Sequence, residues 1–425
     1  MKHVVTEVEL RNGAKGLLID VPDATVASYQ IYFRAGDQYV ASKDIYETAH
    51  IMEHMAFGAN ADFDSSEAFS AEAEKNGAYF NASTGGVGMT YYADCADFEW
   101  ERILKLQQLS ITQPKFLETE FKAESGNVRE ELTGYLSRHP RVLWQNLARA
   151  TGNPLLLDSE TIGTISKITT DDIRTHYRAT HTLKNMRFVL AGNFKKRHDE
   201  LKAMLEKWEL PKGKLLDIPE YKTKKGEVVH LRRKDVPNLT FGLAMLIDRR
   251  MSDAELQAMS TLDHILTGTF HSRIFGKARQ RGLCYGMSSD TSGSTYNSEW
   301  AFGGQVSLEN APELIKLIVD ELLRVKRGDV SAEELADAKS YALGRLQMRC
   351  QTVSQIANWY AGDYFFDGTI DHYEDMPKAI EAVSVDQIVK LANEFFAAKK
   401  WTFGGIGNAP KELLKQLNKQ FDALF

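Results

Sequence analysis

The sequence predicts an α+β protein built of two homologous domains, each a mainly antiparallel sheet covered by helices. Three observations support this fold class. Segments with strand and helix periodicity follow one another without the strict βαβ alternation of a parallel sheet. The length of 425 residues is enough for two to three domains of about 150 residues each. A helix-to-strand segment also occurs twice, at a constant offset.

The elements of the first half follow from this periodicity. Alternating or β-branched residues predict strands over 4–10, 15–21 and 27–33. Apolar residues at helical spacing predict helices over 44–58, 66–76, 98–112 and 117–136. Residues 79–92 again look extended, with the glycines at 85, 86 and 88 as a bend or bulge.

The repeated segment opens a helix near Asp171 and leads to a strand that ends at Asn193. Its second copy opens near Asp386 and ends at Asn408, so both ends are displaced by 215 positions. A constant offset over this distance indicates two related domains, although a generic helix-to-strand unit would look similar. Residues 211–225, which contain two prolines and five lysines, are typical of a linker. The expected domains are therefore 1–210 and 226–425.

Composition narrows the class of protein. With 52 Lys+Arg against 58 Asp+Glu, the formal charge is −6, which gives no general attraction to nucleic acid or anionic membranes. The three cysteines lie far apart without a C-x-x-C pattern, which argues against a disulfide scaffold and a zinc–thiolate site. No signal, transit or membrane-spanning segment is evident, so we expect a cytoplasmic protein.

The sharpest chemical signal is His50-Ile-Met-Glu53-His54. On a helix, residues four apart share a face, so both imidazoles can approach one ion while Glu53 reaches a bound water. The surrounding helix is apolar nearly all round and should be buried, with Asp44 and Glu47 as a capping box at its start. Two core histidines bonded to backbone, with Glu53 in an ion pair, are the alternative.

A third ligand can be sought on the helix expected over 117–136. Glu124 and Glu131 interrupt an otherwise largely apolar stripe of this helix, whereas Glu130 falls on a more polar side. A carboxylate on such a stripe needs a cation or hydrogen-bond partners. Two histidines and one glutamate form the usual ligand set of catalytic zinc, which keeps one coordination position open.

These residues resemble the inverted-motif zinc peptidases, the family of pitrilysin, insulin-degrading enzyme and the mitochondrial processing peptidase. The resemblance implies one zinc ion per chain held by His50, His54 and Glu131, with Glu53 as general base and Glu124 supporting the site. It also implies a processing-peptidase-like fold of two domains. Asn81 and Ala82 look like part of the family's edge strand, which pairs with the backbone of the substrate.

The segment from Ser272 to Tyr285 looks like the second-domain segment that supplies an arginine and a tyrosine to the substrate. The usual arginine position, seven before Tyr285, is Ala278 here, so Arg279 is the expected substitute, with a plain surface charge as the alternative. The resemblance implies a zinc-dependent endopeptidase or oligopeptidase that cleaves extended peptides in an enclosed chamber. The alternatives are a catalytic subunit that needs a partner chain and a non-catalytic scaffold, and a homodimer or heterodimer is expected.

Overall fold

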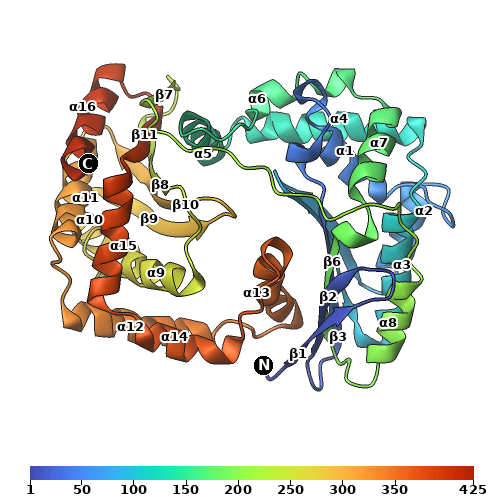
Figure 1. The fold of residues 1–425 in the computed structure, drawn as a ribbon. Coiled ribbons are helices and arrows are strands. Elements are labelled where there is room, and N and C mark those ends of the chain that lie inside the picture. Colours follow the sequence, from blue (N-terminus) through green and yellow to red (C-terminus); the bar gives the residue numbers. More distant parts are fainter. The chain divides into compact units, whose positions relative to one another are not determined.

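The computed structural model describes all residues from 1 to 425 and divides them into two compact units (Figure 1). The first unit consists of Met1–Gly134, Asp158–Pro219 and Met348–Tyr373. The second consists of Tyr135–Leu157, Glu220–Gln347 and Glu374–Phe425. Both units combine one sheet with helices, so the predicted α+β class is confirmed.

The first unit contains a six-stranded sheet in the order β1-β2-β6-β3-β5-β4. Its strands are β1 (Val4–Glu9), β2 (Lys15–Asp20), β3 (Val26–Arg34), β4 (Tyr79–Thr84), β5 (Gly88–Ala96) and β6 (Met186–Gly192). Only β2 and β6 pair in parallel; the other neighbours are antiparallel. The strand β4 pairs with β5 alone and therefore forms an edge of the sheet.

The second unit contains a five-stranded sheet in the order β7-β11-β8-β10-β9. Its strands are β7 (Val229–Arg232), β8 (Asn238–Ile247), β9 (Cys284–Gly293), β10 (Ser298–Ser307) and β11 (Lys400–Gly407). Again one pair, β7 and β11, is parallel and the rest are antiparallel. The two sheets therefore repeat one topology, with β9 at the edge that corresponds to β4.

The repeated sequence segment forms the same structure in both units. In the first unit, α7 (Thr170–Thr180) leads into β6, and in the second, α15 (Val385–Ala398) leads into β11. The helices start in the same way, because the side chains of Thr169 and Ser384 each accept a hydrogen bond from a backbone N–H in the first turn. The repeat found in the sequence is thus a repeat of structure.

The remaining helices cover the sheets. Those of the first unit are α1 (Thr48–Ala56), α2 (Ser66–Glu74), α3 (Trp100–Thr112), α4 (Glu118–Tyr135), α6 (Asp158–Thr161), α8 (His198–Glu206) and α13 (Val353–Phe366). Those of the second are α5 (His139–Ala150), α9 (Asp253–Thr267), α10 (Phe275–Gln280), α11 (Ala311–Lys326), α12 (Ala332–Gln347), α14 (Met376–Ala382) and α16 (Lys411–Phe421). None is long and apolar enough to traverse a lipid bilayer.

Two helices belong to the unit formed mainly by the other half of the chain. Helix α13 packs on the first sheet, where Ile356 and Tyr360 join a core with Leu17 and Val189. Helix α5 packs on the second sheet through residues that include Leu147. The units therefore differ from the continuous halves expected at 1–210 and 226–425. Residues 211–225 lie outside all helices and strands.

The expected start of the motif helix is wrong. Helix α1 begins at Thr48, and a separate 3-10 helix over Lys43–Ile45 precedes it, because Ser42 accepts a hydrogen bond from the N–H of Asp44. The carboxylate of Asp44 pairs with Lys167 at 2.8 Å on the surface and caps nothing. The expectation that this helix is buried is confirmed, since seven of its nine residues are buried.

Candidate metal centre

Helix α1 places His50 and His54 one turn apart on the same side. Their rings lie 5.1 Å apart between centroids and are nearly perpendicular, at 74°. Both side chains are largely shielded from solvent, with 17% and 23% of their surface exposed. Because the rest of the helix is apolar and buried, its packing fixes the direction in which both imidazoles point.

Glu131 on α4 completes a three-residue cluster. Its Oε2 lies 3.5 Å from Nε2 of His50 and 3.6 Å from Nε2 of His54. One ligand atom from each of the three residues lies within 4.8 Å of the others. Ligand atoms about 2.0–2.1 Å from a tetrahedral zinc ion are about 3.4 Å from one another. The donor types and their spacing therefore fit zinc, with one coordination position left for solvent.

The other nitrogen of each imidazole meets a carboxylate. Nδ1 of His50 lies 3.0 Å from Oε2 of Glu47, and Nδ1 of His54 lies 3.0 Å from Oε2 of Glu124. A carboxylate that accepts the Nδ1 proton leaves the Nε2 lone pair free for a metal and holds the ring in place. Glu124, expected as a supporting residue, takes this place at His54.

Glu47 is the site residue that the sequence analysis missed. It was interpreted as part of a capping box, whereas it is the residue just before α1 and its side chain is only 5% exposed. The signal was available, because a residue three before His50 stands on the same helical face. A buried carboxylate at that position requires a hydrogen-bond donor, and His50 supplies one.

Glu53 lies on the same helix and is buried, with 8% of its surface exposed. Burial raises the pKa of its carboxyl group, while a hydrogen bond with Thr84 and then the nearby imidazoles of His50 and His54 lower it in part. A carboxyl group with a raised pKa is suited to accept and return a proton near neutral pH. Glu53 is thus a buried carboxyl group on the helix that carries both histidines, and its pKa is raised.

The cluster carries an excess of negative charge. Burial lowers the pKa of His50, but the hydrogen bond to Glu47 and the charges of Glu53 and Glu131 outweigh it and raise this pKa to about 9. Without a metal ion, the ring is therefore drawn toward the protonated form. A divalent cation between the two imidazoles and Glu131 would balance the same carboxylates.

The expected substrate strand is an edge strand, as the sequence analysis predicted. Asn81 and Ala82 lie in β4, opposite Tyr92 and Tyr91 of β5. Asn81 is exposed, and its side chain accepts a hydrogen bond from the N–H of Ala82 at 2.8 Å and donates one to the hydroxyl of Tyr79 at 2.9 Å. Helix α1 packs against this strand, so the helix that carries both histidines contacts the edge strand within the first unit.

Arg279 and Tyr285 lie together in the second unit. The guanidinium of Arg279 stands 4.3 Å from the centre of the Tyr285 ring and donates a hydrogen bond to the carbonyl of Tyr285 at 3.2 Å. Tyr285 is 85% exposed at the start of the edge strand β9, whereas Ala278 is fully buried in the core. The side chain of Arg279, not that of residue 278, therefore accompanies the tyrosine.

Comparison with known proteins gives two matches to one family. Residues 17–165 match the family described as insulinase (peptidase family M16), and residues 167–341 match the peptidase M16 inactive domain. Together these segments account for most of the chain. His50, His54 and Glu131 all lie within the first matched segment.

Individual relatives are distant. A Bacillus subtilis protein named uncharacterized zinc protease YmxG is 22% identical over 398 residues, covering 91% of this chain and 94% of that protein. A Helicobacter pylori protein named non-peptidase homolog YmxG is 26% identical over 255 residues, 58% of each chain. The mitochondrial-processing peptidase subunit alpha of Solanum tuberosum is 23% identical over 391 residues, 85% of this chain and 75% of that one.

Solved structures share the fold. A crystal structure from Pseudomonas fluorescens, described as a peptidase M16 inactive domain, superimposes with a TM-score of 0.84 at 18% identity and covers 96% of this chain and 98% of its own. A protease from Helicobacter pylori superimposes with a TM-score of 0.81 at 20% identity, over 96% and 100%. At these sequence identities, the superpositions show that the proteins share a fold.

Proposed function

We propose, from the premise that the chain belongs to the M16 peptidase family, that it is a zinc-dependent endopeptidase or oligopeptidase acting on extended peptides. The single observation that carries the proposal is the convergence of His50, His54 and Glu131 at distances that suit one tetrahedral ion. Zinc held there would polarise the scissile carbonyl and lower the pKa of the attacking water from about 15.7 toward about 7.

The chain's own residues supply the proton transfers and the binding. Glu53 takes a proton from the attacking water as the water oxygen bonds to the scissile carbonyl carbon, and it passes this proton to the amine that leaves when the C–N bond breaks. The edge strand β4 near Asn81 and Ala82 binds the substrate backbone as an added strand. Tyr285 and Arg279 are proposed to hold the peptide or its developing oxyanion from the second unit.

The test is the variant Glu53→Gln, which keeps the shape of the side chain and removes the base. We expect it to retain one zinc per chain after dialysis and to lose turnover of a quenched fluorescent peptide by about 10²–10⁴-fold. The exposed Glu67→Gln on α2 is the control and should keep both properties. Wild-type turnover in Glu53→Gln would refute the assignment of the base.

A non-catalytic scaffold is the second candidate, because one relative is named a non-peptidase homolog. It predicts that the purified protein holds no zinc and cleaves no peptide. A catalytic subunit that needs a partner chain is the third, because another relative is named as a subunit. It predicts bound zinc without cleavage until a related chain is added, and light scattering would show whether the protein alone forms dimers.

A further inference from the structure

The metal cluster depends on two helices that are not closely packed on each other. Helix α1 carries both histidines and packs against α7 and β4, whereas Glu131 comes from α4 (Figure 1). Of the 18 residues of α4, only Val128 and Leu132 are buried. Because the apolar packing of α4 is slight, the direction in which this helix presents Glu131 depends on its polar contacts.

Glu120 ties the start of α4 to the segment that follows α1. The backbone N–H of Ala59 donates to its carboxylate, with the nitrogen 2.9 Å from Oε1 and 3.0 Å from Oε2. The N–H of Ser66 also donates to Oε1, at 3.1 Å. Ala59 lies three residues past the end of α1, and Ser66 is the first residue of α2. One side chain of α4 thus holds the end of one helix and the start of another.

The surrounding backbone is built to receive this carboxylate. A Cβ added at Gly58 would stand 2.5 Å from Oε2 of Glu120, so the carboxylate could not keep its place beside an alanine. The carbonyl of Ala59 accepts a further hydrogen bond from the N–H of Lys115, in the segment that leads into α4. A negative charge is also favourable at the N-terminus of α2, and hydrogen bonds to a carboxylate are stronger than neutral ones.

Glu120 and Glu131 lie on the same face of α4. They are eleven residues apart in the sequence, which corresponds to three turns and about 16 Å along the helix axis. A tilt of about 5° at Glu120 would therefore displace Glu131 by about 1.4 Å. Distances between a metal and its ligands vary by only about 0.2 Å. A small tilt of α4 is thus enough to remove Glu131 from the reach of an ion held by the histidines.

The other partnered carboxylates at this end of α4 have different contacts. Glu118 accepts a hydrogen bond from the hydroxyl of Thr170 on α7, at 2.9 Å. Glu124 meets Nδ1 of His54 and so belongs to the cluster itself. Glu120 is therefore the acidic side chain of α4 that joins this helix to the end of α1 outside the cluster.

We propose that Glu120 is a positioning residue of the metal centre. By holding the N–H groups of Ala59 and Ser66, it fixes the angle between α1 and α4 at which Glu131 meets both histidines. Glu120 itself lies three helical turns from Glu131 and binds no metal. The inference rests on the zinc site of the proposed function, but not on the hydrolysis of peptides.

The experiment measures the zinc affinity of the full-length chain by competition with a chelator, without any peptide. We expect Glu120→Ala to bind zinc about tenfold more weakly, at the lower end of the range for residues that support metal ligands. Glu120→Gln keeps one oxygen acceptor and should lose less. Gly58→Ala displaces the carboxylate without removing it and should resemble Glu120→Ala. The melting temperatures of the metal-free forms show which variants keep a stable fold.

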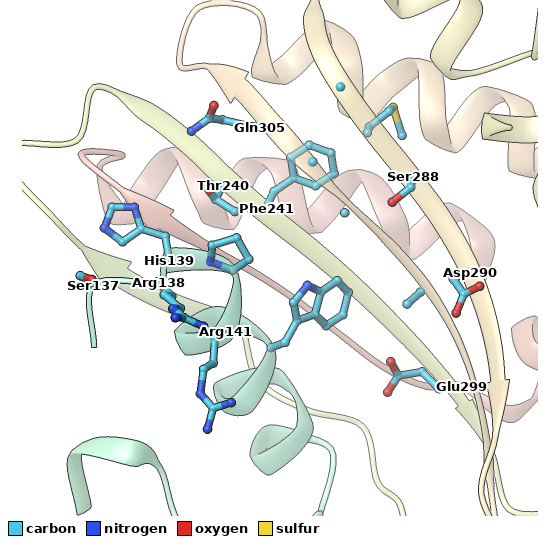
Figure 2. Close-up of a pocket in the computed structure, with 17 residues that line it drawn as sticks. Ser137, Arg138, His139, Arg141, Thr240, Phe241, Ser288, Asp290, Glu299 and Gln305 are labelled. Atoms are coloured by element: carbon cyan, nitrogen blue, oxygen red, sulfur yellow. The ribbon is translucent and has the colours of Figure 1, made fainter. Parts of the chain in front are cut away.

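Two control variants change acidic groups that do not join the helices. Glu130→Ala removes an exposed charge from α4, one residue from Glu131. Glu299→Gln changes a carboxyl group that lines a cavity of the second unit (Figure 2). Both should bind zinc as tightly as the wild type, because neither group contacts the segment after α1.

A second background separates positioning from a general loss of structure. Glu131→Gln removes the charge of the ligand that α4 delivers, so the direction of α4 matters less for zinc binding. In this background Glu120→Ala should weaken binding only about twofold, because the two effects are coupled. A variant that merely loosens the fold would lower the affinity equally in both backgrounds. The visible spectrum of cobalt-substituted Glu120→Ala should also differ from that of the wild type, since it reports the geometry of the ligands.

Wild-type zinc affinity in a folded Glu120→Ala, or an equal loss in the two backgrounds, would overturn the proposal. Because no peptide is present, the two proposals fail separately. A protein whose zinc affinity falls in Glu120→Ala but which cleaves no peptide would refute the peptidase alone. A zinc peptidase whose affinity does not change in Glu120→Ala would refute the role of Glu120 alone. A chain that holds no zinc would refute both.

Discussion

Removing the carboxylate of Glu47 should weaken the binding of zinc without unfolding the first unit. The perturbation is Glu47→Gln, which keeps the volume and an oxygen acceptor but loses the charge, compared with Glu47→Ala, which loses both. In the structure Glu47 meets Nδ1 of His50 at 3.0 Å and its side chain is 5% exposed, so water does not readily replace it.

The expected loss of zinc affinity follows from the general contribution of a carboxylate that holds a metal-binding histidine. Outer partners of metal-bound histidines are generally worth about 10–100-fold in metal affinity, or about 1.4–2.7 kcal/mol. We expect Glu47→Ala near the upper end, because His50 then loses both its partner and its orientation. Glu47→Gln should lie near the lower end, since its amide oxygen can still accept the Nδ1 proton.

The assay is competition for zinc with a chelator of known affinity, supported by the visible spectrum of the cobalt-substituted protein, which reports the geometry of the ligands. Glu67→Gln on α2 serves as the exposed control. The melting temperatures of the metal-free wild type and variants show whether a loss of zinc affinity comes from the orientation of His50 or from a destabilised fold. Wild-type zinc affinity in a folded Glu47→Ala would refute the reasoning that this carboxylate positions His50.

The remaining predictions concern other contacts. Glu124→Ala should also lower zinc affinity about 10–100-fold in the same competition assay, because His54 loses its Nδ1 partner. Asn81→Ala should raise KM about fivefold with little change in kcat, as expected if one neutral hydrogen bond to substrate is lost at the strand proposed to bind it. Burial raises the pKa of Glu334, but hydrogen bonds from Arg273 outweigh it and lower this pKa to about 2. The stabilisation is therefore present above about pH 4.5 and lost as the pH falls toward 2, so the difference in melting temperature between wild type and Glu334→Gln should shrink over that range.

Part of the candidate site could be predicted from the sequence, because helical periodicity places its residues on shared faces and the family resemblance joins the two helices. His50 and His54 share a face wherever the helix starts, and a carboxylate such as Glu131 on a partly apolar stripe needs a partner. Glu47 stands three residues before His50 on the same face, but its interpretation as part of a capping box concealed its role beside His50. Helix α1 begins after Glu47 without a side-chain cap, and Ser42 caps only the 3-10 helix that precedes it.

The periodicity of the sequence could not predict that α5 belongs to the second unit and α13 to the first. The apolar residues of α13, such as Ile356 and Tyr360, show that the helix is buried, and its Thr352 cap shows where it starts. Neither feature indicates which of two sheets of the same topology the helix covers. That choice depends on the fit between side chains far apart in the sequence, which a local pattern does not contain.

The position of α13 has a consequence for how the protein is made. On the ribosome, the last strand of the first sheet, β6, emerges long before Val353–Phe366. Until α13 is made, the apolar face of the first sheet around Leu17 and Val189 is not covered by this helix. Nascent chains should therefore depend on a chaperone through much of their synthesis. Chains truncated before α13 should aggregate instead of forming a folded first unit.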